Sequence, residues 1–306
     1  MFIVVMNTSN ILPNGKNNTL VYKFPNSVVF KEKYIAVSSI QMYYSWFNIN
    51  SLYNNMTVSY TWTVGVVSTT YTITIPNGLY NIVDINAYFQ WVMINNGTYL
   101  INNVGDNVYY FEIIVNPTRY AIQLNTFQVP IALPALWTAP ANFVGFPTQT
   151  FNPIITFPNN FWKIVGYEPI NGVIFVSNGN VNNAYVPPTA SVDNYYVAKD
   201  GVGTLSYLSN VSPNVQPNSS IYLGISNINN PYTQPSSIIY SLSPSVAIGE
   251  LINETPPNFM WNRLIDGTYN ELRLQFLGLD LQPIQLNDPN MTILLTIKDK
   301  DEASGK

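Results

Sequence analysis

Residues 272–299 read LRLQFLGLDLQPIQLNDPNMTILLTIKD, which is two runs of alternating apolar and polar residues joined by a polar turn. In the second run, Met291, Ile293, Leu295 and Ile297 share one face, because successive side chains of a strand point to opposite sides. A charged tail follows at once. The pattern predicts a half-buried strand near the end of the chain, with a charged exit.

The same alternation recurs throughout the sequence. Short runs with apolar residues at every second position, bounded by Asn, Gly and Pro, are typical of half-buried antiparallel strands. Six further runs of this kind occupy residues 58–64, 71–75, 111–115, 120–124, 221–225 and 238–242. The sequence therefore predicts an all-β protein.

One segment has helical spacing instead. Between residues 84 and 95 the apolar side chains recur at intervals of three and four, which predicts a helix. Asp84 is the expected N-cap, and Gly97 lies where the helix would end. A second, short helical turn is expected at residues 160–165.

The composition is poor in charge. Charged residues make up 9% of the 306 residues, against roughly 25% in an average soluble protein, whereas aromatic residues make up 14%. Disordered chains show the reverse composition, so the chain is expected to fold. Interface cores lack charge because burying an ion is unfavourable, so the composition favours a protein surrounded by neighbours. A codon bias toward Asn and Ile is the alternative explanation.

The net charge of −4 argues against non-specific nucleic-acid binding, which needs clustered Lys and Arg. The apolar run at residues 2–6 is too short for a signal peptide, and no apolar stretch approaches the length of a membrane-spanning helix. We therefore expect no nucleic-acid partner, no membrane-spanning segment and synthesis in a cytoplasm.

Histidine and cysteine are both absent. This removes the usual general base near neutral pH, the thiol nucleophile, disulfides and the common zinc ligands. No phosphate-binding glycine motif occurs. Residues 105–107 (GDN) and 266–268 (DGT) predict hairpin turns rather than calcium loops. We predict no enzyme, and no catalytic, cofactor or metal residue; calcium bridged by surface carboxylates at an interface stays open.

Two kinds of residue remain as candidates for a site. The acids Glu250, Glu254 and Asp266 lie beside turn residues, and we assign them to turns or solvation; a carboxylate pair of glycoside-hydrolase type is the alternative. The aromatic runs 43–47 (YYSWF) and 161–162 (FW) could stack on sugar rings. We assign them instead to the core or to a subunit interface, where aromatic residues are common.

Several stretches, in order, resemble the penton proteins of virophages and Polinton-like viruses. They are FPNSVVFKEKYIAVSSIQMYYSWFNIN (24–50), YTITIPNGLYNIVDINAYFQ (71–90), NFWKIVGYEP (160–169), IYLGISNINN (221–230), SSIIYSLSP (236–244) and the closing segment quoted above. Residues 126–215 match least. The family's pentons are capsid proteins of icosahedral five-fold vertices and are not enzymes.

The resemblance implies a single eight-stranded antiparallel jelly roll with an inserted, mainly β domain carrying one short helix. We assign residues 1–55 and 201–298 to the roll, 56–200 to the insertion and 299–306 to a mobile tail. The closing strand would pair inside a sheet and complete the sandwich. A major capsid protein of this lineage resembles two fused rolls and is longer, so the length favours the minor protein.

The predicted function is structural: a homopentameric penton of the virion that contacts major capsid protein capsomers and is made in the host cytoplasm. The interface residues are unknown at this stage. The alternative is a viral attachment or lectin-like jelly-roll module, for which Trp46 and Trp162 are the residues to test.

Overall fold

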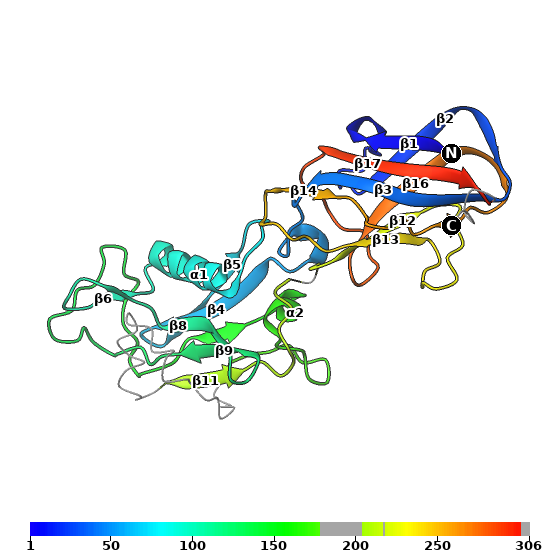
Figure 1. Cartoon of the computed structure of the whole chain (residues 1–306). Coiled ribbons are helices and arrows are strands. Elements are labelled where there is room, and N and C mark those ends of the chain that lie inside the picture. The colour runs from blue at the N-terminus through cyan, green and yellow to red at the C-terminus, as the bar shows by residue number, and fades with distance from the viewer. Residues whose placement is uncertain (178–203, 217, 301–306) are drawn as a thin grey trace. The chain divides into compact units, whose positions relative to one another are not determined.

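The computed structural model describes residues 1–177, 204–216 and 218–300 (Figure 1). The chain forms two compact units. The first unit combines Met1–Phe47 with Pro217–Lys306, and the second is Asn48–Gln216. The second unit is therefore inserted into the sequence of the first.

The first unit contains two antiparallel sheets. One sheet has the order β1-β17-β3-β14, with the short strand β15 also paired to β3, and the other has the order β13-β12-β16-β2. The strands of the first sheet are β1 (Phe2–Asn7), β17 (Met291–Asp299), β3 (Lys33–Tyr43), β14 (Leu251–Glu254) and β15 (Asn262–Arg263). Those of the second are β13 (Ile238–Leu242), β12 (Ile221–Ile225), β16 (Gly267–Leu277) and β2 (Thr19–Phe30).

The strand order identifies the topology. Apart from β15, the eight strands described in this unit fall in the order first, eighth, third, sixth in one sheet and fifth, fourth, seventh, second in the other. This interleaving is the double Greek key of a jelly roll. The predicted fold class, an all-β jelly roll, is confirmed. The insertion enters between the third strand, β3, and the fourth, β12.

The closing strand β17 lies between β1 and β3, as Figure 1 shows for the red strand. Its register with β3 shifts after Leu294, because Ser38 is an extra residue on β3, and the Ser38 Oγ donates to the Leu294 carbonyl over 3.0 Å. The bulge changes the phase of β3: Val37 is buried before it and Ile40 after it. The predicted inward face of β17 is buried, with Ile293 among its fully enclosed residues.

The prediction that a mobile tail begins at residue 299 is wrong for its first two residues. Asp299 is the last residue of β17, and its carboxylate forms an ion pair with Lys33. The backbone nitrogen of Lys300 donates to the Glu32 carbonyl over 3.1 Å. Asp299 and Lys300 are thus held against the turn after β2 and the start of β3. Residues 301–306 lie outside the described residues.

Both sheets contribute to one core in the roll. The core contains apolar side chains of every long strand, including Val4 of β1, Leu223 of β12 and Phe276 of β16. Each lies at an alternate position of its strand, which is why the sandwich can bury one face of each sheet.

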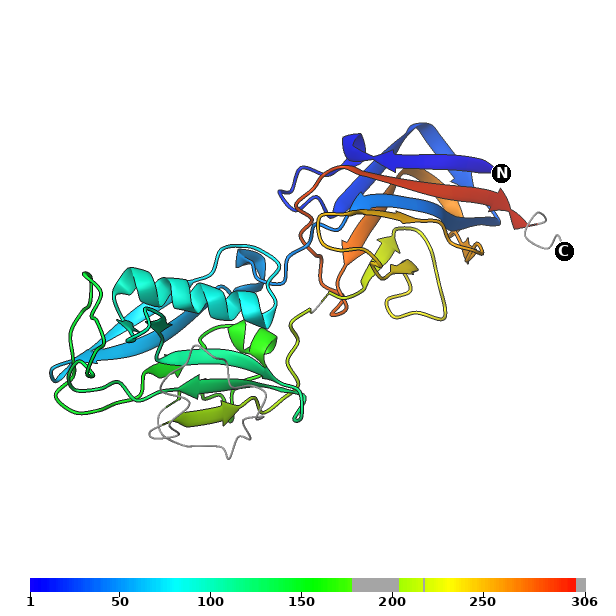
Figure 2. The ribbon, with the colours of Figure 1, turned by 60° about the vertical axis from the view of Figure 1, so that its left-hand side comes forward.

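The second unit has three small sheets and two α-helices among its described residues (Figure 2). The sheets are β10-β4-β5, β11-β9-β8 and β6-β7. Their strands are β4 (Thr57–Val64), β5 (Val67–Thr74), β6 (Leu100–Ile101), β7 (Asn107–Val108), β8 (Phe111–Asn116), β9 (Ala121–Thr126), β10 (Ile154–Thr156) and β11 (Leu205–Leu208). The helices are α1 (Ile82–Asn96) and α2 (Phe161–Val165), and together the elements enclose a core of their own.

The helix α1 begins three residues earlier than its predicted cap implied. Asn81, not Asp84, is the N-cap: its side chain accepts from the Asp84 backbone nitrogen, and the Asp84 carboxylate accepts from the Asn81 nitrogen. This reciprocal pair is a capping box, so Asp84 occupies its third position. Gly97 ends the helix as predicted, with φ of 65°.

The observed units differ from the predicted boundaries at both junctions. Residues 48–55, predicted to lie in the roll, belong to the second unit, and so do residues 204–216. The buried side chain of Asn48, the first residue of the second unit, fixes the chain to that unit, because its Nδ2 donates to the carbonyls of Tyr80 and Val215. The predicted hairpin at 266–268 is also wrong, because β15 and β16 pair with different sheets; the turn at 105–107 does join the paired strands β6 and β7.

Candidate functional site

The acids singled out from the sequence have structural partners. The Glu250 carboxylate accepts from the Ala247 backbone nitrogen over 2.9 Å. Asp266 accepts from the Glu32 nitrogen over 3.0 Å and forms an ion pair with Arg263 at 3.1 Å. Both therefore fix turns, as predicted.

Two aromatic residues of the run 43–47, Tyr44 and Trp46, lie in the core of the roll, whereas Tyr43 is exposed. Trp46 is 2% exposed, its Nε1 donates to the Asn218 carbonyl over 2.9 Å, and its ring contacts Tyr44 with 4.3 Å between centroids. A buried indole with its only donor occupied cannot stack on a sugar. The prediction that this run belongs to the core is confirmed for Trp46, whereas Trp162 is half-buried beside Lys163.

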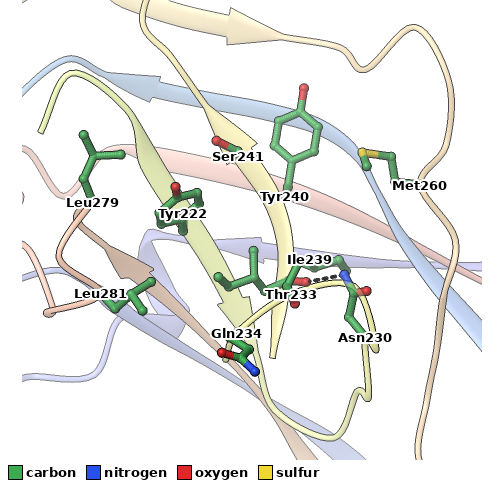
Figure 3. Close-up of a pocket in the computed structure, with 11 residues that line it drawn as sticks. Tyr222, Asn230, Thr233, Gln234, Ile239, Tyr240, Ser241, Met260, Leu279 and Leu281 are labelled. Carbon is green, nitrogen blue, oxygen red and sulfur yellow. Dashed lines mark hydrogen bonds between the residues drawn. The ribbon is translucent and has the colours of Figure 1, made fainter. Parts of the chain in front are cut away.

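A shallow pocket of about 520 Å³ lies beside β12 and β13 (Figure 3). Its lining includes Tyr222, Asn230 and Ser241, and none of its lining residues is an acid, a lysine or an arginine. The Tyr240 hydroxyl donates to Glu254 Oε1 over 3.0 Å, and burial, with a further contribution from Glu254, raises the pKa of Tyr240 to about 12. Tyr240 stays protonated at neutral pH, so the pocket supplies no general base.

A row of polar side chains crosses the sheet β11-β9-β8. Glu112 of β8 lies opposite Asn125 of β9, which lies opposite Ser206 of β11. Asn125 Nδ2 donates to Glu112 Oε1 over 2.7 Å, and Ser206 Oγ donates to Asn125 Oδ1 over 2.7 Å. Gln123 Nε2 donates to the same Asn125 oxygen over 2.8 Å. The four side chains form one connected network.

The network lies on the face of the sheet opposite the core. Alternate residues such as Ile113 and Leu124 belong to the core, so the polar side chains point the other way. Glu112 is nevertheless only 3% exposed, and its Oε2 has no hydrogen-bond partner among the described residues. Burial raises the pKa of Glu112 to about 7, and the hydrogen bond from Asn125 opposes that shift.

The chemical capacity of this row is proton binding. A single carboxyl near neutrality can take up and release a proton, but the row holds no second carboxylate with which to form a catalytic pair, and the Ser206 hydroxyl donates to Asn125 rather than to Glu112. Among the described residues, no group of three or more Asp or Glu side chains is placed to hold a metal ion. Within the same residues, no helix has the length and apolar character needed to cross a membrane.

The roll exposes uncharged apolar residues along its edges. The strand β1 is an edge strand of its sheet, and its Ile3 and Val5 side chains point to solvent. Natural edge strands are usually protected by Lys, Pro or a bulge. β1 reads FIVVMN and contains none of these, which makes it a candidate surface for contact with another chain.

Sequence reasoning missed the buried network and the exposed edge. Glu112 is the only acid between Asp106 and Glu168, and its position in an alternating run predicts exposure to solvent. In a chain so poor in charge, a lone carboxylate in the middle of a strand was the available signal.

The first unit thus belongs to the class of single jelly rolls, here with a domain inserted between its third and fourth strands. No protein-family model matches the sequence, and no curated protein matches it. Among solved structures, the chain is similar to the mavirus penton protein, with 10% identity, 97% of each chain covered and a TM-score of 0.42. It is also similar to a chain in the structure of the Sputnik virophage, with 12% identity, 99% of each chain covered and a TM-score of 0.35.

Proposed function

We propose that the chain is a structural capsid protein: a penton that forms homopentamers at the five-fold vertices of an icosahedral virion and contacts the surrounding major capsid protein capsomers. The proposal involves no catalytic step, no cofactor and no nucleic acid. It places the protein in the virion after synthesis in the host cytoplasm. The ordered sequence resemblance to virophage pentons and the jelly-roll strand order support it.

The observation that carries the proposal is the uncharged edge of the roll. A ring of five needs a heterologous interface, in which one flank of a copy fits the opposite flank of the next. Interface cores are depleted of charge, and β1 offers an exposed apolar strand with an unpaired outer edge among the described residues. With charged residues at 9% of the chain, such a contact buries few ions.

Sedimentation velocity and native mass spectrometry of the purified full chain test the proposal. We expect a pentamer, either alone or after addition of major capsid protein. The double substitution Ile3→Asp with Val5→Asp should shift the population toward monomer, because it places two charges in the proposed contact. Tyr120→Asp is the matched control: Tyr120 is exposed on the second unit, and its φ of 50° suits Asp.

A chain that remains monomeric both alone and with major capsid protein would contradict the proposal. If the β1 double substitution leaves the pentamer unchanged, the penton assignment stands, but β1 is not part of the interface between its copies. Negative-stain images of the purified protein would distinguish a closed ring from an open filament.

A further inference from the structure

The roll has two opposite flanks, and each flank combines the outer strands of both sheets. β1 and β14 lie at the two ends of one sheet order, and β2 and β13 lie at the two ends of the other. β1 contacts β2, and the Leu12 nitrogen, just after β1, donates to the Thr19 carbonyl of β2 over 2.8 Å. The Tyr240 hydroxyl of β13 donates to Glu254 of β14 over 3.0 Å. We call β1 with β2 the β1 flank, and β13 with β14 the β13 flank.

The β13 flank exposes large side chains around the pocket beside β13. Met260 and Leu279 line this pocket, and both are exposed (Figure 3). Phe259, next to Met260, is exposed, and Tyr232, in the loop that lines the pocket, is 94% exposed. Tyr, Phe and Met are enriched in protein interfaces, so these residue types favour a protein as the occupant.

The two flanks carry charges of opposite sign. From its start to the end of β2 the chain holds Lys16 and Lys23 and no acid. From β12 to the end of β14 it holds Glu250 and Glu254 and no Lys or Arg. Asp280 adds a further exposed acid between two residues that line the pocket. The β1 flank is therefore basic and the β13 flank acidic.

The nearest charges of the other sign are paired within the chain. Arg263 of β15, which follows the β13 flank along the edge of β3, forms an ion pair with Asp266 at 3.1 Å. Glu271 of β16, next to the β1 flank, forms one with Arg273 at 3.4 Å. These pairs leave the opposite signs of the two flanks unchanged.

The strand register places the exposed apolar residues of the two flanks at the same level along the strands. Through β17, Ile3 of β1 lies across from Ala36 of β3. Asn262 of β15 lies across from the adjacent residue, Ile35. Ile3 is therefore level with the segment that contains Met260. Rotation about an axis parallel to the strands keeps this level, so it can bring Ile3 of one copy to Met260 of the next.

The opposite charges and the common level select a second copy of this chain as the occupant. On the basis of the penton function, we propose that the β1 flank of each copy docks on the β13 flank of the next, with Ile3 against the rim of the pocket. Two different flanks that fit each other give a head-to-tail contact, which can close into a ring. Like charges oppose the contact of either flank with its own kind.

Mixing two disabled variants tests this pairing under the condition in which the unaltered chain forms a pentamer. Ile3→Asp with Val5→Asp disables the β1 flank. Leu251→Lys with Met260→Lys, at exposed residues, disables the β13 flank. Each change adds the sign of charge that the partner flank carries, so either variant alone should assemble at least about tenfold more weakly. A one-to-one mixture should give mixed dimers and nothing larger in native mass spectrometry, because each pair keeps one intact flank of each kind.

A matched control and a cross-link complete the test. Val66→Lys with Val104→Lys, at exposed residues of the second unit, should form the pentamer. Because the chain has no cysteine, single cysteines report contacts without background. Chains with Ile3→Cys and chains with Met260→Cys, mixed and treated with a short bis-maleimide, should form mixed dimers. Ile3→Cys chains alone should not be cross-linked. Circular dichroism checks that each variant is folded.

Three results would overturn the inference. The first is a pentamer that Leu251→Lys with Met260→Lys leaves unchanged. The second is cross-linking of Ile3→Cys chains to one another, which would show that like flanks meet. The third is a mixture of the disabled variants that stays monomeric while the cysteine chains give no mixed dimer. The penton proposal fails differently, through an unaltered chain that is monomeric both alone and with major capsid protein.

Discussion

Glu112 makes the stability of the second unit depend on pH. Its ordinary pKa is 4.5, and burial raises it to about 7 in the folded chain. A carboxyl whose pKa rises on folding prefers its protonated form in the folded state. The contribution of Glu112 to the free energy of unfolding is therefore fully present below pH 4.5 and is lost as the pH rises through 7.

The size of the effect follows from the two pKa values. One pKa unit is worth about 1.4 kcal/mol. The rise in pKa from 4.5 to about 7 therefore makes the free energy of unfolding about 3 kcal/mol larger in acid than in alkaline solution. Glu112→Gln removes this dependence, because a neutral amide can accept from Asn125 with its oxygen and leaves no buried charge. At pH 8 the variant should be more stable than the unaltered chain by about 3 kcal/mol, and at pH 4.5 about equal to it.

Scanning calorimetry from pH 4.5 to 9 would measure this difference, and amide hydrogen exchange of β8 and β9 would localise it. A stabilisation of about 3 kcal/mol raises the melting temperature by roughly 6 to 12 °C for a unit of this size. Glu168→Gln, at an exposed acid of the same unit, is the control and should give the unaltered profile. Parallel pH profiles for the unaltered chain and Glu112→Gln would refute the reasoning.

Three further predictions concern the second unit and the roll that remains when it is removed. Asn81→Ala removes the helix cap of α1 and should lower the free energy of unfolding by about 1 kcal/mol, measured by urea denaturation. Gly97→Ala should destabilise more strongly, by about 2 kcal/mol, because its φ of 65° disfavours a side chain and the new Cβ would collide with the Asn142 carbonyl; little or no loss would contradict the close approach. Replacing residues 48–216 by a short Gly-Ser linker should leave a folded roll, and far-ultraviolet circular dichroism with a cooperative melt would check it.

The strands could be predicted from the sequence because each has one face in a core. Alternation located β4, β12 and β17, and the strand order then placed β17 inside a sheet as expected. The bulge at Ser38 could not be predicted from the sequence. Ser38 and Ser39 are both polar, so the sequence does not say which of them, if either, is the extra residue of the strand. The exact cap of α1 was missed because Asn81 and Asp84 are both good caps, and only the paired bonds decide between them.

The candidate sites were harder to predict than the strands. Alternation assigns Glu112 and Asn125 to the face away from the core, and this assignment is right. It does not say whether that face meets water, and both side chains are buried. The polar face of a strand carries the same pattern whether it is solvated or covered, so burial depends on tertiary contacts that the local sequence does not encode.

The inserted unit is compatible with the roll because each unit closes on itself at the junctions. In the roll, Trp46 lies just before the first junction and bonds to Asn218 just after the second, over 2.9 Å. In the insertion, Asn48 lies just after the first junction and bonds to the Val215 carbonyl just before the second, over 2.6 Å. Each unit therefore holds together its own two segments at the junctions. Neither unit needs the other to keep these segments close. The entropy of closing a loop grows only slowly with its length, which explains how one interstrand connection can hold a whole domain without loss of the eight-stranded order.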